Sequence, residues 1–341
     1  MAPLFVDIGL LLAFRKLRHA AVVILLGIFS IGGFGLYLHS LGLPWLPSSV
    51  LFKSQVASAG MDMSGNSLGS FLVALGRNLN SNLDAYGGPQ IVVMVAVLLA
   101  VFTRFRNPID GFRSDPVKGV VGLFAALISF AHLTGGRLGS YSRYEVYVVV
   151  LDLCALALVY REPLNAWLRT ATIPGHIIVA VMLVFLFSGY ARSTLITPAA
   201  AAYVYDESYQ LRRFVAHYYG RPVAVNHLGI IDYRDPQYVL DLSGKGSEQA
   251  RRAIATRQPG DWIDQLTRGH DVDLAIIYPT VGPPLPASWH AVGRMDLRGH
   301  PHTLPGNTVV FYATEENEIA RIVDDLRRFA PTLPRGVSLE F

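Results

Sequence analysis

The sequence contains a single cysteine and few charged residues. Because Cys154 stands alone among 341 residues, no disulfide can form within the chain and cysteines cannot supply a zinc cluster. Charged residues make up 16% of the chain, against about 25% in an average soluble protein. The deficit lies in residues 1–190, which carry 13 Lys/Arg and 8 Asp/Glu, whereas residues 191–341 carry 16 and 17. The second stretch therefore has the composition of a soluble domain.

The sequence also lacks the motifs of several common functional classes. It contains no phosphate-binding loop, no dinucleotide-binding glycine pattern and no Gly-x-Ser-x-Gly elbow. The net charge of +4 comes from residues 1–190 and is accompanied by no nucleic-acid-binding motif. We therefore expect membrane lipids as partners of the basic loops and no nucleic acid.

Five apolar runs predict a helical membrane domain. A helix needs roughly 20 mostly apolar residues to cross a bilayer. The predicted spans are residues 20–38, 89–104, 117–134, 145–160 and 173–190. Pro3 to Phe14 is apolar but too short to span alone. We expect a membrane all-α bundle of about five spans over residues 1–198, followed by a small α/β domain over residues 199–341.

The distribution of basic residues predicts the orientation of these spans. Nine lie in the loops on one side: Arg15, Lys16, Arg18, Arg104, Arg106, Arg113, Lys118, Arg161 and Arg169. The opposite loops hold Lys53, Arg77, Arg137 and Arg143. Since positive loops stay in the cytoplasm, we expect a multi-pass protein of the cytoplasmic membrane with its C-terminal domain outside the cytoplasm.

The predicted outer loop over residues 39–88 is long. Pro44 and Pro47 block a regular helix at its start. Ser67 to Leu79 has apolar residues at helical spacing. Two interpretations remain open for this segment: an amphipathic helix resting on the bilayer, or a helix packed against the spans.

The C-terminal tail alternates helical and strand patterns. Strands are predicted at residues 222–226, 238–242, 273–278 and 308–313, and helices at 207–219, 247–257 and 316–329. The last helix begins with acidic residues and ends with Arg327 and Arg328, which matches the helix dipole. We expect an α/β sandwich, and a mixed sheet is left open.

Three polar residues in the predicted spans are candidates for a cavity. Asp152 lies in mid-span, where a carboxylate is costly and faces a cavity or a partner. Glu145 lies seven residues earlier, on the same face of the helix. Their pairing indicates an acidic face that lines a cavity; a protonated Asp152 bonded to a neighbouring helix is the alternative. His132 could line the same cavity or be structural.

Basic residues beside the outer ends of the spans are candidates for binding phosphate. Arg143 and Tyr144 precede the fourth predicted span, and a guanidinium matches the geometry of phosphate oxygens. Arg137 and Lys53 could add to the same site. Interfacial anchoring explains Arg143 and Tyr144 equally well.

The tail offers a second group of polar residues. Asn226, His227, Asp232 and Asp241 follow predicted strands and should lie near one edge of the sheet. Structural capping explains them at least as well as a binding site. The histidines of the tail lack metal-ligand spacing apart from His300-x-His302. We expect no metal site, and a divalent cation is the one cofactor left open.

Several segments together resemble the C-terminal half of class C glycosyltransferases. The matching segments are Pro44 to Lys53, Arg143-Tyr144-Glu145-x-Tyr147, Asn226 to Tyr233, Tyr238 to Gly244, Trp262-Ile263 and Asp271 to Tyr278. The resemblance implies a polytopic enzyme that moves a sugar from a polyprenyl-phosphate donor to a glycan or lipid acceptor outside the cytoplasm. His227 stands where the family pattern usually has aspartate.

The resemblance also implies a catalytic carboxylate that this sequence does not match. In the family this acid lies in the first outer loop, ahead of spans that have no counterpart here. We therefore expect a truncated or split enzyme that acts with an N-terminal partner chain. Within this sequence only Asp62 and Glu145 could replace the acid, and neither belongs to a motif.

Two functions from different classes follow. The first is a membrane glycosyltransferase, or its C-terminal fragment, that uses a polyprenyl-phosphate sugar donor. The alternative is a non-catalytic membrane protein whose outer α/β domain binds glycan or a partner enzyme. A transporter fits poorly with about five spans and a large outer domain.

Overall fold

The computed structural model describes residues 2–54, 56–57, 67–100, 115–140, 142–234, 236–258, 261–297 and 306–341. The chain forms two compact units. The first, here called the membrane unit, comprises Met1–Pro47 and Lys53–Leu195. The second, here called the α/β unit, comprises Ser48–Phe52 and Ile196–Phe341.

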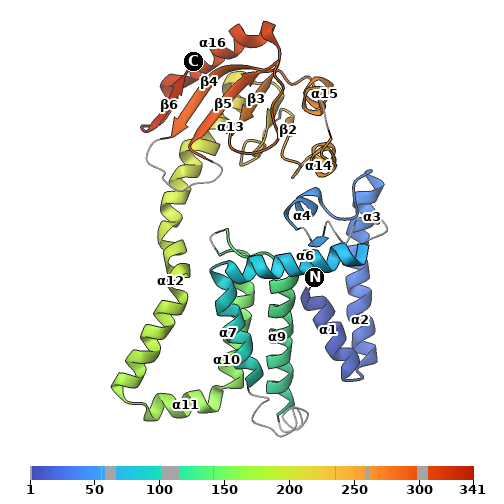
Figure 1. Cartoon of the computed structure of the whole chain (residues 1–341), viewed down its shortest axis with the longest axis vertical. Coiled ribbons are helices and arrows are strands. Elements are labelled where there is room, and N and C mark those ends of the chain that lie inside the picture. Colours follow the sequence, from blue (N-terminus) through green and yellow to red (C-terminus); the bar gives the residue numbers. More distant parts are fainter. Residues whose placement is uncertain are drawn as a thin grey trace. The chain divides into compact units, whose positions relative to one another are not determined.

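The membrane unit is built from helices (Figure 1). They are α1 (Ala2–Ala13), α2 (Leu17–Gly27), a π-helical turn (Ile28–Gly32), α3 (Gly33–Ser40), α6 (Ser67–Asp84), α7 (Gly87–Ala100), α9 (Pro116–Gly135), α10 (Val146–Val159), α11 (Arg161–Thr170) and α12 (Ile173–Val204). Three continuous helices are long and apolar enough to cross a membrane: Leu17–Ser40, Pro116–Gly135 and Ile173–Tyr219. The predicted membrane character is thereby supported.

The predicted count of five spans is not confirmed. The fourth predicted span corresponds to α10, which is only 14 residues long. The second corresponds to α7, which has 14 residues and is long enough to span only together with α6, and that pair is bent by 98°. Among the described residues there are thus three candidate spans, or four if the bent pair is one. An apolar run in a sequence does not reveal such a bend.

A glycine makes the corner between α6 and α7 possible. A Cβ atom on Gly88 would lie 2.0 Å from the carbonyl oxygen of Asn82, so any larger residue would force the backbone apart. Before the corner, α6 runs across the ends of α7 and α9 (Figure 1) and packs against both. Of the two interpretations open for this segment, packing against other helices agrees with the structure.

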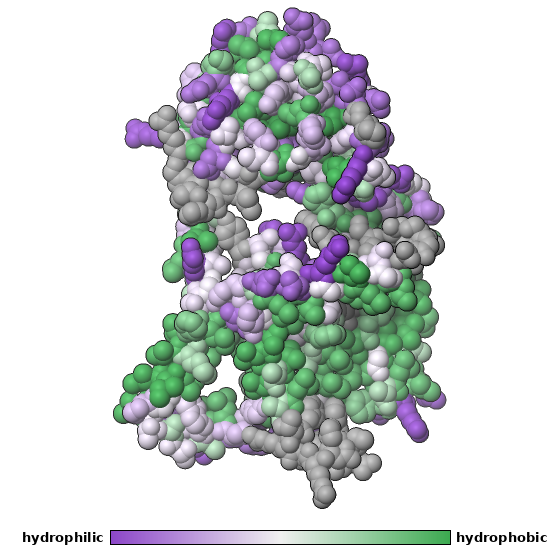
Figure 2. Space-filling view, in the orientation of Figure 1, coloured by the Kyte–Doolittle hydropathy of each residue, from purple (hydrophilic) through white to green (hydrophobic). Residues whose placement is uncertain are grey.

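The outer surface of the membrane unit is apolar. Figure 2 shows hydrophobic residues over much of its helices, whereas polar residues are frequent over the α/β unit. Phe29 and Phe185 are 83% and 82% exposed, respectively. Contiguous apolar surface of this kind is rare on soluble monomers and is stable in contact with lipid.

The α/β unit contains a six-stranded mixed sheet of order β2-β1-β3-β5-β4-β6. The strands are β1 (Val223–Val225), β2 (Val239–Asp241), β3 (Leu274–Ile277), β4 (His290–Leu297), β5 (Thr308–Ala313) and β6 (Val337–Glu340). Strands β2, β1 and β3 are parallel, and the remaining pairings are antiparallel.

Helices cover both faces of this sheet. Helix α13 (Gln210–Phe214), its flanking π-helical turns (Tyr205–Tyr209 and Val215–Tyr219) and α16 (Ile319–Phe329) contribute Phe214 and Phe329 to the core on one face, against Phe311 of β5. Helices α14 (Glu248–Ala255) and α15 (Trp262–Gly269) contribute Ala250 and Trp262 to the core on the other. The predicted α/β sandwich is confirmed. Strands β4 and β6 and helix α15 were not predicted.

A short helix from the loop between the first helices belongs to this unit. Helix α4 (Ser48–Lys53) has its residues Ser48–Phe52 in the α/β unit. The Ser48 hydroxyl donates to Glu248 Oε2 at 2.9 Å, and the Lys245 ammonium lies 5.7 Å from the centre of the Phe52 ring. The α/β unit is therefore completed by a segment nearly 150 residues away from it in sequence.

Candidate functional site

In the membrane unit, two asparagines of α6 anchor the start of the loop over residues 136–145, which joins α9 to α10. Asn78 Nδ2 donates to the carbonyl oxygens of Thr134 and Gly136, at 2.9 and 2.6 Å. Asn82 Nδ2 donates to the Leu133 carbonyl at 2.8 Å, and its Oδ1 accepts from the Leu138 N–H at 3.2 Å. These amides replace the backbone partners that a helix would provide, as lipid surroundings require.

Glu145 anchors the other end of this loop. Its side chain is 1% exposed, and its Oε2 accepts from the Gly139 N–H at 2.9 Å. A Cβ atom on Gly87 would lie 3.2 Å from Glu145 Oε1, so α7 packs directly over the carboxylate. The carboxylate is therefore enclosed by protein, and its use as a catalytic base remains a prediction.

Asp152 and His132 are held by neighbouring helices. The Ser129 hydroxyl of α9 lies 2.8 and 2.9 Å from the two carboxylate oxygens of Asp152, which is fully buried. Such a contact corresponds to the structural alternative for this residue. His132 Nδ1 lies 2.8 Å from the Tyr147 hydroxyl, and among the described residues its buried Nε2 has no partner. The structure thus places Asp152 and Glu145 in separate hydrogen-bonded settings.

Arg137 and Arg143 are exposed near the two ends of the fixed loop. The Arg143 guanidinium lies 5.1 Å from the centre of the Tyr144 ring, and Nη2 donates to the Tyr144 hydroxyl at 3.3 Å. In the described part of the chain, no ion pair engages either arginine. Two exposed cations thus flank this loop, and Arg137 lies in the part whose backbone Asn78, Asn82 and Glu145 hold. The Lys53 side chain and all of Asp62 lie outside the described residues.

In the α/β unit, Asn226 joins the carboxyl ends of β1 and β3. Its Nδ2 donates to the carbonyl oxygens of Tyr278 and Val281 at 2.9 and 2.7 Å, and its Oδ1 accepts from the Tyr278 N–H at 3.0 Å. Asn226 is 3% exposed, and these three hydrogen bonds all reach backbone atoms. Asn226 therefore fixes the loop that follows β3.

Asp241 has a similar role after β2. It accepts from the N–H and hydroxyl of Ser243 at 2.8 and 2.6 Å and from the Gly246 N–H at 2.6 Å. His227 lies close by: burial lowers the pKa of its imidazole, nearby Lys245 lowers it further and Asp241 opposes the change. Asp232 is exposed in the turn after β1. Of the four candidates, Asn226, His227 and Asp241 gather at the carboxyl ends of the parallel strands.

A pocket of about 730 Å³ opens beside these loops. Its lining combines three charged groups with apolar walls: Phe52, Ser243, Lys245, Ala253, Ile254, Arg257, Gln258, Asp261, Trp262, Ile263 and residues 281–287. Lys245, Arg257 and Asp261 were not among the site residues predicted from the sequence. Each of the three residues lies next to the end of a predicted or observed element: Lys245 follows β2, Arg257 follows α14 and Asp261 precedes α15. Only the packing of α14 and α15 brings them to one pocket.

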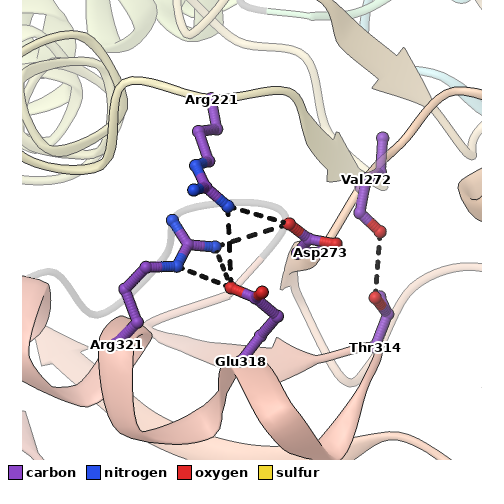
Figure 3. Close-up of polar contacts among 6 residues, drawn as sticks. All are labelled: Arg221, Val272, Asp273, Thr314, Glu318 and Arg321. Carbon is purple, nitrogen blue, oxygen red and sulfur yellow. Dashed lines mark hydrogen bonds and ion pairs between the residues drawn. The ribbon is translucent and has the colours of Figure 1, made fainter.

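The amino ends of the same strands carry a closed ionic network (Figure 3). Arg221 precedes β1, Asp273 precedes β3, and Glu318 and Arg321 lie at the start of α16. Arg221 lies 3.4 Å from Asp273 and 3.7 Å from Glu318; Arg321 pairs with the same two acids. Burial, together with Glu318, raises the pKa of Asp273, and the two arginines oppose this change. Each charge in this network has partners within the protein.

Comparison with known proteins adds one finding for the α/β unit. Residues 199–312 match the family model of a domain of unknown function, DUF8728. This stretch runs from the end of α12 into β5 and includes the pocket lining from Ser243 onward. No curated protein and no solved structure matches the chain significantly.

Proposed function

We propose that this chain is a membrane component of sugar transfer from a polyprenyl-phosphate donor, and that Arg137 and Arg143 hold the donor phosphate. One observation carries this proposal: Asn78, Asn82 and Glu145 bond to the backbone of residues 136–139, around Arg137, and the guanidinium groups of Arg137 and Arg143 are exposed. An arginine on an ordered backbone binds phosphate at a smaller entropic cost.

The resemblance to class C glycosyltransferases supports the same assignment. With the five spans that the apolar runs predict, the distribution of basic residues favours the cytoplasmic membrane, with this loop and the α/β unit on the outer face. Inverting transfer also needs a carboxylate base. Since Glu145 is enclosed and bonded to Gly139, we assign the base to Asp62 or to a partner chain.

Lipid-phosphate binding by the full chain in nanodiscs tests this proposal. The probe is a polyprenyl-phosphate monosaccharide, titrated against the wild-type chain and against Arg137→Ala and Arg143→Ala. We expect each substitution to weaken binding by at least about tenfold, because a charge-assisted bond contributes roughly 1.5–3 kcal/mol. Arg77→Ala is the matched control, an exposed arginine on α6. Equal affinity of all four proteins would rule out the assigned phosphate site.

A second function is favoured by the pocket of the α/β unit. In this alternative the chain is non-catalytic and its outer domain binds glycan or a partner enzyme. Transfer of radiolabelled sugar in membranes separates the two functions. If the chain takes part in sugar transfer, Arg143→Ala should abolish transfer by the assembled system. If the chain only binds glycan, the wild type should show no transfer and glycan binding should survive Arg143→Ala.

A further inference from the structure

The pocket of the α/β unit lies where open sheets with parallel strands bind ligands. Strand β1 is central to the parallel part, with β2 on one side and β3 on the other. The connections after the adjacent strands β1 and β3 therefore run to opposite sides, towards β2 and β4 respectively, and ligands bind outside the carboxyl ends of strands at such a point. Lys245 follows β2 and residues 281–287 follow β3, so both loops contribute to the pocket from this edge.

Two cations that line the pocket form no ion pair with the described residues. Ion pairs elsewhere in the described α/β unit engage many of its arginines, among them Arg251, Arg252 and Arg268. Within the same described ranges neither Lys245 nor Arg257 forms an ion pair; the contact of Lys245 is with the face of Phe52. An anion that enters the pocket would thus meet two cations without having to displace an internal carboxylate.

The remaining polar lining suits a ligand with hydroxyl groups. Asp261 stands at the N-terminus of α15, but its side chain makes no capping hydrogen bond there, so both carboxylate oxygens can accept. Gln258 also lines the pocket, and its amide offers both donors and an acceptor. Hydroxyl groups can donate to Asp261 and exchange both kinds of bond with Gln258.

Apolar side chains complete the walls. Ile254, Pro284 and Leu285 line the pocket together with Trp262, which is 7% exposed and belongs to the core beneath it. The volume falls in the range of about 300–1,000 Å³ that is usual for small-ligand sites. A ligand must therefore combine an anionic group and hydroxyl groups with an apolar face.

We propose that this pocket binds an anionic saccharide, a sugar ring that carries a carboxylate or a phosphate. Lys245 and Arg257 contact the anionic group, Asp261 and Gln258 contact ring hydroxyls, and the C–H face of the ring packs on Pro284 and Leu285. The proposal rests on the second function above, glycan binding by the α/β unit, and specifies its ligand class. Phe52 of α4 adds a residue from the loop over residues 39–88 to the same site.

Calorimetric titration of the full chain in nanodiscs tests the proposal with three probes. They are an oligogalacturonate, glucose 1-phosphate and the neutral trisaccharide maltotriose, and the two anionic probes distinguish carboxylate from phosphate. We expect at least one anionic probe to bind at least tenfold more tightly than maltotriose, with an affinity that falls as salt rises. Lys245→Gln and Arg257→Gln should each weaken that binding about tenfold, whereas Arg335→Gln, an exposed arginine outside the pocket, should not.

Three results would overturn parts of this inference in different ways. If maltotriose binds as tightly as the anionic probes and Lys245→Gln has no effect, the anionic class is wrong while glycan binding stands. If no saccharide binds to the folded wild-type chain, glycan binding itself is wrong. If anionic binding persists in the Lys245→Gln/Arg257→Gln double variant, the ligand binds elsewhere. Melting curves of each variant establish that the chain remains folded.

Discussion

The loop over residues 136–145 and the carboxyl edge of the sheet use the same structural device in different surroundings. In each, a buried asparagine replaces a backbone partner: Asn82 bonds to Leu133 and Leu138, and Asn226 bonds to Tyr278 and Val281. Each region also presents two cations that no described ion pair engages. In both, side-chain amides bond to irregular backbone beside charges available to a ligand.

The two regions differ in what accompanies the cations. Beside Arg137 and Arg143 the acidic group, Glu145, is enclosed and bonded to backbone, so the exposed surface is cationic. Beside Lys245 and Arg257 the acid, Asp261, lines the pocket, together with apolar walls. Cations alone suit a phosphate head group, whereas cations beside an acceptor and an apolar wall select a larger, hydroxylated ligand. The difference in neighbours therefore predicts different ligands.

The largest effect on stability is expected from replacing either buried asparagine, Asn82 or Asn226. Asn82→Ala and Asn226→Ala should each lower the free energy of unfolding by about 3 kcal/mol, because buried backbone groups lose their partners. The loss should be greater for Asn82, since water can replace a missing amide less readily in lipid surroundings. Thermal unfolding of the full chain in detergent, followed by circular dichroism, measures both.

Asn80 provides the control for this comparison. It is exposed on α6, two residues from Asn82, and its amide lies 3.5 Å from Asp84. Asn80→Ala should change the free energy of unfolding by less than about 0.5 kcal/mol. Equal losses in Asn80→Ala and Asn82→Ala would mean that the loop is not held by the buried amide.

A smaller loss is expected at the corner that positions Asn82. Gly88→Ala should destabilise the membrane unit by about 2 kcal/mol, because its Cβ would meet the Asn82 carbonyl oxygen and the backbone must shift. Gly76 is the matched control on α6, where an added Cβ meets no atom within 4 Å. Gly76→Ala should be neutral or stabilising, since alanine favours helix. Melting temperatures in one detergent compare the pair; a more stable Gly88→Ala would contradict the close contact.

Secondary structure was predictable where apolar periodicity was regular. Strands β1, β2, β3 and β5 fall inside their predicted ranges, because β1 and β3 are short runs of buried residues, β2 is mostly buried and β5 alternates between buried and half-buried residues. Strand β4 was not predicted, because its register shifts between Ala291 and Gly293 and the charged residues Arg294 and Asp296 interrupt its apolar residues. The predicted number of spans is not confirmed, because apolar runs do not reveal the 98° corner between α6 and α7.

The positions of candidate site residues were predictable only where a residue directly follows a predicted strand. Asn226 and Asp241 follow strands, so parallel pairing brings them to one edge, as expected. The pocket cations were missed because Lys245 and Arg257 come from different elements and meet only through the packing of α14. Phe52 could not be foreseen at all, since its contact with Lys245 joins residues far apart in the chain.

A moderate, pH-dependent effect is expected near the pocket at Glu248. Burial alone would raise the pKa of this carboxyl, but hydrogen bonds from Arg251, Arg252 and Ser48 lower it to about 2. Its stabilising contribution is therefore complete above the ordinary value of 4.5 and is lost as the pH falls towards 2. After discounting for solvent screening we expect about 1 kcal/mol.

Glu248→Gln tests this contribution. The variant should melt below the wild type at pH 6, and the difference should narrow as the pH is lowered from 4.5 towards 3. Glu315→Gln is the control. The Glu315 carboxylate lies 3.4 Å from Arg268, and both side chains of this pair are more exposed than Glu248. A gap between Glu248→Gln and the wild type that stays constant with pH would show that the carboxylate charge is not responsible.

The smallest effect is expected at the amino edge of the sheet, where the network in Figure 3 has its charges paired. The raised pKa of Asp273 means that the folded state holds this proton more tightly than the unfolded chain, so its ionised form brings no net stability above the ordinary pKa. Asp273→Asn should therefore change the free energy of unfolding by no more than about 0.5 kcal/mol. A double-mutant cycle with Arg221→Met measures the coupling. Saccharide binding should be unchanged in both single variants, because these charges are satisfied within the protein; a tenfold loss in either would place the ligand at the amino edge and reverse the contrast between the two ends of the sheet.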